Sequence, residues 1–265
     1  MYTMKLIVTI FSTIFFLISN SAMGQEKDPD LITDRPDQTE SSSTVPIKSL
    51  QFELGFLLEN DKSPNWENTY RQYPGLLLRY GLLDNLELRF GAVYGDNRLN
   101  SRVDASEDLS KGLNPLSAGI KVFISEENGI IPELAFIGGL SIPRTGHPDF
   151  QIDNLTPSFL LAASHSLAEY LGLGWNIGAE WESFNPKPNG IYSVVLGLSA
   201  NDRLGIFIES YGRYAQNEPA DHRADAGFTF LLMPNFQIDA SAGLGISEAA
   251  PDYFVSFGAS YRIRP

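Results

Sequence analysis

The stretch Tyr253-Phe254-Val255-Ser256-Phe257-Gly258-Ala259-Ser260-Tyr261-Arg262-Ile263 decides the fold class of this chain. Successive side chains of a β-strand point to opposite faces of the sheet. One face of this stretch is small or polar except at Phe254, and the other is apolar throughout: Tyr253, Val255, Phe257, Ala259, Tyr261 and Ile263. The stretch is therefore predicted to be a strand whose two faces meet very different surroundings.

The same alternation recurs in segments of about ten residues from Ser49 onward, and it is equally regular in residues 171–182 and 236–247. About twelve strands are predicted, an even number as in bacterial outer-membrane barrels. The predicted fold class is all-β, an antiparallel, up-and-down transmembrane β-barrel formed by residues 48–265. The strands are expected to begin near Leu50, Gly75, Leu86, Leu116, Ile131, Pro157, Leu171, Ile191, Leu204, Ala224, Phe236 and Tyr253.

The connectors between these strands alternate in length. Short turns are predicted at residues 83–85, 126–129, 166–169, 201–203 and 233–235, and longer loops at 60–69, 96–112, 143–155, 184–189, 216–223 and 247–252. Outer-membrane barrels have short periplasmic turns and longer external loops. The pattern therefore predicts an outer-membrane protein with both chain ends in the periplasm. Aromatic residues at strand ends, such as Tyr80 and Trp181, suit the two bilayer interfaces.

The N-terminal region and the composition narrow further the kinds of protein that this chain can be. Lys5, a short apolar run and the small residues Ala22 and Gly24 predict a secretory signal peptide over residues 1–24. The chain has no Cys, which excludes disulfides and thiolate metal sites. Its formal net charge of −13 argues against nucleic acid, which binds basic surfaces. Residues 25–47 are polar and contain three Pro, so they form a separate segment.

A soluble secreted β-sandwich is the alternative fold. It also alternates, but its polar face must meet water. Such a face would carry more Lys, Thr and Glu than this chain does. Here the second face is rich in Gly, which suits a curved barrel wall. The barrel is therefore favoured, and dependence on detergent would separate the two.

The predicted inward face carries charged residues: Glu53, Arg79, Glu87, Arg89, Lys121, Glu180, Glu209, Arg213, Asp225, Asp239 and Arg262. Two interpretations stay open, a charged pore lining that selects solutes and an internal network that stiffens a closed barrel. If the turn at residues 83–85 pairs Leu82 with Leu86, Arg79 lies opposite Arg89. This unfavourable pair would be offset by Glu87. The slight excess of acids favours a mild bias against anions.

Several stretches resemble a family of Gram-negative envelope proteins named for the MetA pathway of phenol degradation, whose members are labelled transporters. They are Ile32-Thr33-Asp34-Arg35-Pro36-Asp37-Gln38-Thr39-Glu40, Leu76-Leu77-Leu78-Arg79-Tyr80-Gly81-Leu82, Leu86-Glu87-Leu88-Arg89, Asp225-Ala226-Gly227 and Pro234-Asn235-Phe236-Gln237-Ile238-Asp239. The resemblance spans most of the mature chain. It implies an outer-membrane barrel and transport of small molecules, with aromatic or hydrophobic compounds as candidates.

The segment of residues 25–47 has two interpretations. Its Pro- and Ser-rich polar sequence is typical of a disordered periplasmic tail. The resemblance favours a plug or gate that folds into the lumen, with Asp34, Arg35, Asp37 and Glu40 as the candidate contacts and Arg35 meeting acids of the wall. No nucleophile, base and orienting group can be combined, so no catalytic residue, metal site or cofactor is predicted.

The sequence therefore predicts a passive or gated outer-membrane channel for small molecules and not an enzyme. The alternative is a non-conducting structural or interaction barrel in the same membrane. The expected partners are outer-membrane lipid, the barrel-assembly machinery and a small-molecule solute.

Overall fold

The computed structural model describes residues 30–183 and 185–264, so the predicted signal peptide lies outside the described residues. The described chain forms one short 3-10 helix, η1 (Pro148–Phe150), and a series of strands. The strands are β1 (Leu50–Lys62), β2 (Trp66–Leu83), β3 (Leu86–Ser101), β4 (Glu107–Leu113), β5 (Ser117–Ser125), β6 (Glu133–Ser141), β7 (Thr156–Ala168), β8 (Leu171–Glu182), β9 (Asn185–Ser199), β10 (Leu204–Tyr214), β11 (Asp221–Met233), β12 (Phe236–Gly245) and β13 (Tyr253–Ile263).

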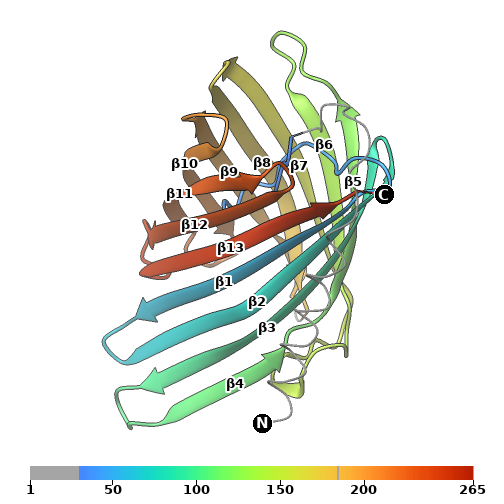
Figure 1. Cartoon of the computed structure of the whole chain (residues 1–265). Helices are drawn as coiled ribbons and strands as arrows, with labels where there is room; N and C mark the ends of the chain where they lie inside the picture. The colour runs from blue at the N-terminus through green and yellow to red at the C-terminus, as the bar shows by residue number, and fades with distance from the viewer. Residues whose placement is uncertain (1–29, 184, 265) are drawn as a thin grey trace.

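These strands close into an antiparallel barrel (Figure 1). Neighbours in sequence pair with each other except β4 and β5, and β1 pairs with β13 over the whole of β13, which joins the two ends of the sheet. β4 and β5 share one wall position, because β5 pairs with residues 86–91 of β3 and β4 pairs with residues 94–100 of β3. The barrel therefore has twelve wall positions, and the predicted fold class is confirmed.

Residues of several predicted loops lie in strands instead. Residues 60–69 and 96–112 were expected to be loops, but β2 begins at Trp66, β3 continues to Ser101, and β4 occupies Glu107–Leu113. A transmembrane strand needs only about ten residues, whereas β2 has 18 and β3 has 16. The excess extends past the other strands as hairpins (Figure 1). Both faces of these ends are polar, so apolar alternation could not reveal them.

The barrel is inverted relative to a soluble protein. Its largest fully buried side chains include Arg79, Lys121, Gln51, Glu53 and Glu87. Large apolar side chains lie on the outer face instead, among them Phe56, Phe90, Phe136, Ile177, Ile208, Phe228, Val255 and Phe257. Such a distribution matches a wall with hydrocarbon outside and a polar interior. Within residues 30–183 and 185–264, no helix has the length and apolar character needed to cross a bilayer.

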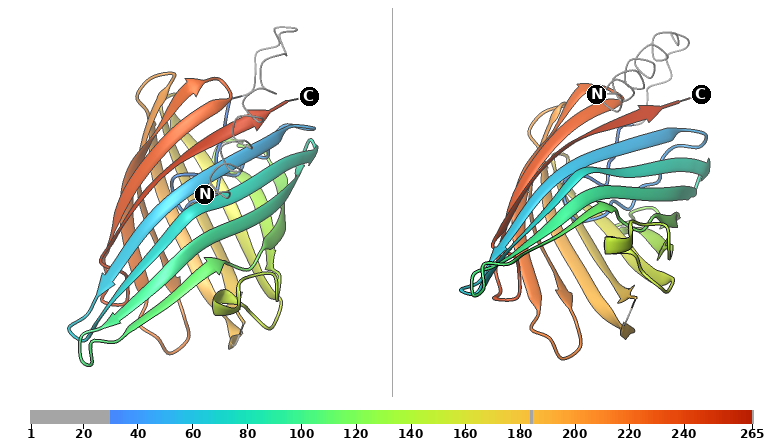
Figure 2. Two further views of the ribbon diagram at one scale, coloured as in Figure 1. Left: turned by 60° about the horizontal axis from the view of Figure 1, so that its bottom comes forward. Right: turned by 90° about the horizontal axis from the view of Figure 1, so that it is seen from below.

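Residues 30–48, here called the N-terminal segment, run inside the barrel before β1 begins (Figure 1, Figure 2). The segment is not a strand of the wall, and it joins the sheet only at its end, where Ile47 forms a bridge with Gly81. Asp30 lies at the barrel end that carries the short turns, since Arg262 near the end of β13 donates to its carbonyl oxygen at 3.0 Å. The segment therefore enters and leaves the lumen at the same end.

Candidate functional site

The N-terminal segment is held by side chains from every side of the wall. Hydrogen bonds join it to β1, β2, β3, β5, β6, β7, β8, β9, β10, β12 and β13. Strand alternation explains this geometry, because every second residue of each wall strand points inward. The candidate functional site is the lumen together with this segment.

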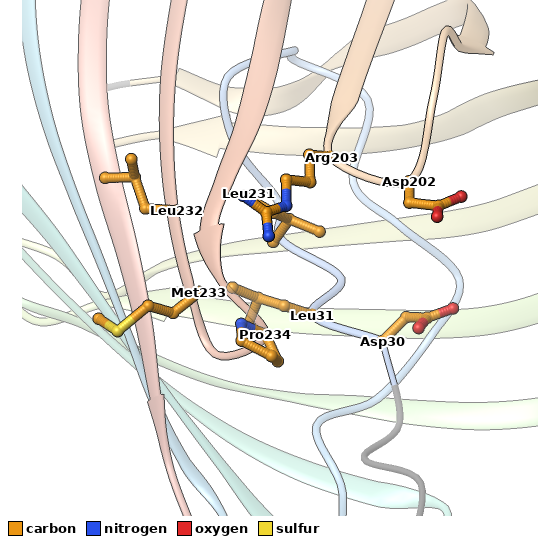
Figure 3. Close-up of a pocket in the computed structure, with 8 residues that line it drawn as sticks. All are labelled: Asp30, Leu31, Asp202, Arg203, Leu231, Leu232, Met233 and Pro234. Atoms are coloured by element: carbon orange, nitrogen blue, oxygen red, sulfur yellow. The ribbon is translucent and has the colours of Figure 1, made fainter.

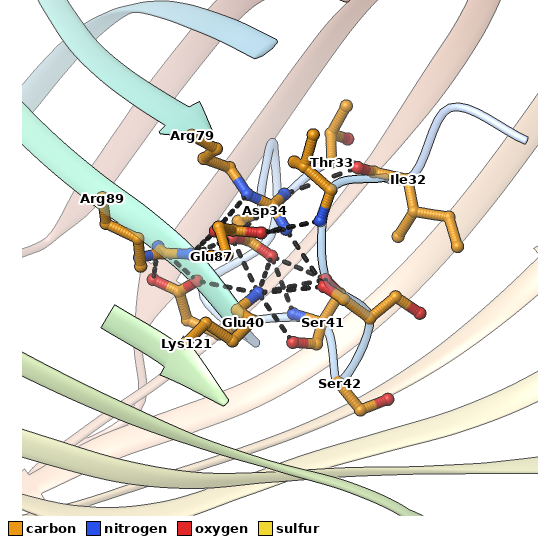
Figure 4. Close-up of polar contacts among 12 residues, drawn as sticks. Ile32, Thr33, Asp34, Glu40, Ser41, Ser42, Arg79, Glu87, Arg89 and Lys121 are labelled. Atoms are coloured by element: carbon orange, nitrogen blue, oxygen red, sulfur yellow. Dashed lines mark hydrogen bonds and ion pairs between the residues drawn. The ribbon is translucent and has the colours of Figure 1, made fainter. Parts of the chain in front are cut away.

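Asp34 is the most strongly bound residue of the segment (Figure 4). Its carboxylate lies 2.6 Å from an Arg89 nitrogen, 3.1 Å from an Arg79 nitrogen and 2.9 Å from Lys121 Nζ. The Asp34 and Lys121 side chains are at most 1% exposed. Burial opposes ionisation of Asp34, but the three cations together hold its pKa well below its usual range. Arg79, Arg89 and Lys121, here called the basic cluster, thus bind a carboxylate of the same chain.

The basic cluster is built by strand register. β2 and β3 place Arg79 directly opposite Arg89, as the sequence predicted, although the turn pairs Leu83 with Leu86. Glu87 receives hydrogen bonds from both guanidinium groups, at 2.8 and 3.1 Å. Glu53 on β1 accepts another from Arg79 at 2.9 Å. Wall acids therefore offset part of the repulsion, and the segment supplies the rest.

Glu40 binds the same cluster from farther along the segment. Both of its carboxylate oxygens accept hydrogen bonds from Arg89 Nη2, at 2.7 and 2.9 Å. Its backbone amide donates to the Asn176 side chain on β8 at 2.7 Å. Burial raises the pKa of Glu40 to about 7, and Arg89 opposes that rise. Glu40 thus titrates near neutral pH while it holds the segment in the lumen.

Arg35 binds the wall at β12 and β13, next to the position where β13 pairs with β1 and closes the sheet. Its guanidinium forms an ion pair with Asp239 of β12 at 3.0 Å and donates to Ser256 of β13 at 3.1 Å. Gly55 and Gly258 lie beneath it, and a Cβ on Gly55 would collide with the guanidinium. Glycine at these positions therefore leaves the space that Arg35 occupies.

The wall at β10 and β11 is acidic, in contrast to the wall that carries the basic cluster. Glu209 and Asp225 are cross-strand partners, and both are buried. Glu209 accepts hydrogen bonds from the Gln38 backbone amide and the Thr39 hydroxyl. The side-chain neighbour of the Asp225 carboxyl is the acid Glu209 and not a cation. Burial, and then the charge of Glu209, raises the pKa of the neighbouring Asp37 well above its usual range.

The remaining predicted lumen residues lie away from these contacts. Arg213 is part-exposed and pairs with Glu182 at 2.6 Å, with Glu180 at 3.9 Å. Arg262 donates to the Asp30 carbonyl oxygen, at the place where the segment enters the barrel. There a cavity of about 230 Å³ lies between the segment and the short turns (Figure 3). Its lining residues are Asp30, Leu31, Asp202, Arg203, Leu231, Leu232, Met233 and Pro234.

Several uncharged or isolated contacts were missed by the sequence reasoning. Glu133 on β6 accepts hydrogen bonds from the Ser42 and Ser43 hydroxyls, at 2.7 and 3.1 Å. Ser193, Ser164 and Asn176 bind Thr39, Ser42 and Glu40. Asn176 was already on the predicted inward face, so alternation located its position. Its partner could not be found, because nothing local to β8 indicates the segment.

Comparison with known proteins places this architecture in a family. The family model described as "Putative MetA-pathway of phenol degradation" matches residues 33–263. The chain belongs to this family. The match begins inside the N-terminal segment and ends at the last residue of β13, so it covers both the bonded segment and the whole barrel. The resemblance on which the sequence prediction drew is confirmed.

Solved structures share the fold at low sequence identity. The COG4313 outer membrane channel from Pseudomonas putida F1 is 15% identical, with a TM-score of 0.67, covering 84% of this chain and 98% of that one. The AIDA-I autotransporter transport unit from Escherichia coli is 8% identical, with a TM-score of 0.54, covering 82% and 89%. The NalP translocator domain from Neisseria meningitidis is 12% identical, with a TM-score of 0.52, covering 81% and 88%. No curated protein matches the sequence.

Proposed function

We propose that this chain is an outer-membrane channel for small molecules, and that its N-terminal segment gates the lumen. The mature chain would then consist of an N-terminal region, residues 25–47, which contains the gate, and a barrel, residues 48–265, with both ends in the periplasm. The observation that carries the proposal is a closed barrel whose polar lumen holds a bonded but separate segment. Apolar side chains on the outer face support lipid contact.

The way the segment is attached supports movement. Its contacts with the wall are mostly side-chain hydrogen bonds and ion pairs, and only Ile47 bridges into the sheet. If the segment leaves, water rather than lipid replaces it, so Arg89 and Asp239 regain hydration. The free-energy cost of breaking their ion pairs with the segment is therefore lower than in a dry protein core, where an unpaired charge is very unfavourable. Such a segment can dock and undock without unfolding the barrel.

Features of the structure and its neighbours support transport over catalysis. The COG4313 neighbour is an outer membrane channel. Ser164 points into the lumen and binds Ser42, whereas His165 lies near Glu127 at 4.0 Å, so this adjacent Ser and His do not act together. Among the described residues, no group of three or more acids and histidines is arranged to hold a metal ion. Aromatic or hydrophobic compounds are the proposed solutes, on the strength of family membership.

Planar-bilayer recording tests the proposal. The full chain should show low conductance with rare openings, and a chain lacking residues 25–44 should stay open. Heat-modifiable gel mobility verifies that both preparations are folded barrels. If the folded deletion chain conducts no more than the full chain, the segment is not a gate, and the alternative of a non-conducting structural barrel is favoured.

A further inference from the structure

The charges around the basic cluster do not balance without the N-terminal segment. Arg79, Arg89 and Lys121 bring three positive charges, and the wall acids in contact with them, Glu53 and Glu87, bring two negative charges. One positive charge is left over on a largely buried wall. This local positive excess exists although the lumen as a whole is acidic, because the uncompensated acids, Glu209 and Asp225, lie across the barrel.

The segment brings two carboxylates to this cluster, Asp34 and Glu40, and Asp34 is the one that all three cations bind at close range, in the manner of a bound ligand. Two guanidinium groups and one ammonium group converge on its carboxylate, at 2.6 to 3.1 Å. The Ser41 hydroxyl also donates to Asp34, at 2.7 Å. Planar guanidinium donors are matched to carboxylate oxygens, and an ammonium group adds a point charge. The wall therefore forms a carboxylate-binding site that is filled from within the chain.

We propose that the basic cluster is a binding site for the carboxylate of an anionic solute, and that this solute opens the channel by displacing Asp34. The inference rests on the proposed gating function and names the solute class, a small monocarboxylate. The single unbalanced positive charge of the wall suits one negative charge, and the arginine forks suit its planar shape. Uncharged compounds of the same size have no group to exchange for Asp34.

Competition of this kind follows from linkage. A solute that binds the cluster only when Asp34 has left multiplies the equilibrium ratio of undocked to docked segments by 1 + [L]/Kd. At a solute concentration of ten times Kd, the ratio of open to closed channels should rise about tenfold. The gate would then respond to the presence of its own cargo.

The test uses benzoate as the probe, with benzyl alcohol as an uncharged analogue of the same ring size. In planar bilayers at constant ionic strength, benzoate should raise the open probability of the full chain about tenfold, and benzyl alcohol should not. Lys121→Met should open more often without solute and lose the benzoate response. Arg98→Gln is the matched control, because Arg98 lies on β3 but beyond the cluster, paired with Glu107; it should keep the response.

Current through the chain lacking residues 25–44 gives a second measurement that does not depend on Lys121→Met folding. Benzoate should bind the vacated cluster and reduce this current saturably, more than benzyl alcohol does. If the deletion chain conducts and neither preparation distinguishes benzoate from benzyl alcohol, the carboxylate site is refuted while the channel stands. If the deletion chain does not conduct, the proposed gating function itself fails.

Discussion

Two Asp→Asn substitutions three residues apart should move the gate in opposite directions. Asp34 lies among three cations, whereas Asp37 lies beside the acids of β10 and β11. Asp34→Asn removes the charge that neutralises the basic cluster and should favour the open state. Asp37→Asn removes a charge that its surroundings oppose and should favour the closed state. The two variants have the same net charge, so a general electrostatic effect cannot produce the difference.

The magnitude for Asp34 follows from its burial and its partners. Removing one partner of a buried ion pair costs about 3–5 kcal/mol. Asn keeps the shape of Asp and can still accept one hydrogen bond, and water can enter the lumen, so the lower end applies. About 3 kcal/mol corresponds to a change on the order of a hundredfold in the ratio of undocked to docked segments.

Single-channel recording at pH 7.5 measures both effects as open probability. Asp108→Asn, at an exposed position on the external hairpin, is the control and should behave like the unmodified chain. Heat-modifiable mobility verifies that each variant is folded. The reasoning is refuted if Asp34→Asn leaves the open probability unchanged, or if both variants shift it in the same direction.

Three further outcomes are expected. Glu40 has a pKa of about 7 in the docked segment, above its ordinary 4.5, so docking takes up protons and should weaken as pH rises from 5 to 8. The open probability should therefore rise over this pH range. Glu40→Gln should flatten that rise, and a pH profile that the substitution leaves unchanged would contradict the assignment. Gly55→Ala should displace Arg35 and raise open probability, unlike Gly197→Ala, whose Cβ meets nothing within 4 Å; equal effects would count against the Arg35 contact. Phe257 is 60% exposed on the outer face, and Phe257→Arg should cost about 2–4 kcal/mol of barrel stability in denaturant titrations in lipid, so an unaltered midpoint would argue against lipid contact there.

Much of the wall could be predicted because its information is local. Period-two alternation fixed which side chains face inward. The pairing of Arg79 with Arg89 was predicted from a turn that pairs Leu82 with Leu86; the turn instead pairs Leu83 with Leu86, and a register shift between Gly81 and Leu83 restores the predicted pairing. The external hairpins could not be predicted from this alternation, because strands that are polar on both faces carry no apolar period. Their hydrogen-bonded pairing is visible only in the structure, where Thr69 pairs with Arg98.

The partners of the N-terminal segment could not be predicted, because they lie far away in sequence. Asp34 meets Lys121, 87 residues later, and Arg35 meets Asp239, 204 residues later. Alternation placed each wall residue in the lumen but gave neither its depth nor its position around the barrel. Arg35 was expected to meet a wall acid, and the structure identifies that acid as Asp239. Closing the sheet decides these contacts, since it sets which strands face each other across the lumen.

Under the proposed gating, the two interpretations of the lumen charges, a pore lining and a stiffening network, describe two states of the same residues. With the segment docked, Arg79, Arg89 and Lys121 are paired with Asp34 and Glu40, so the basic cluster is neutralised. With the segment undocked, the same three cations line a water-filled wall opposite Glu209 and Asp225. Charges of opposite sign then face each other across the lumen, and a solute passing between them is oriented by its own charge. In the proposed channel, the closed state is therefore stabilised by the groups that would select solutes in the open state.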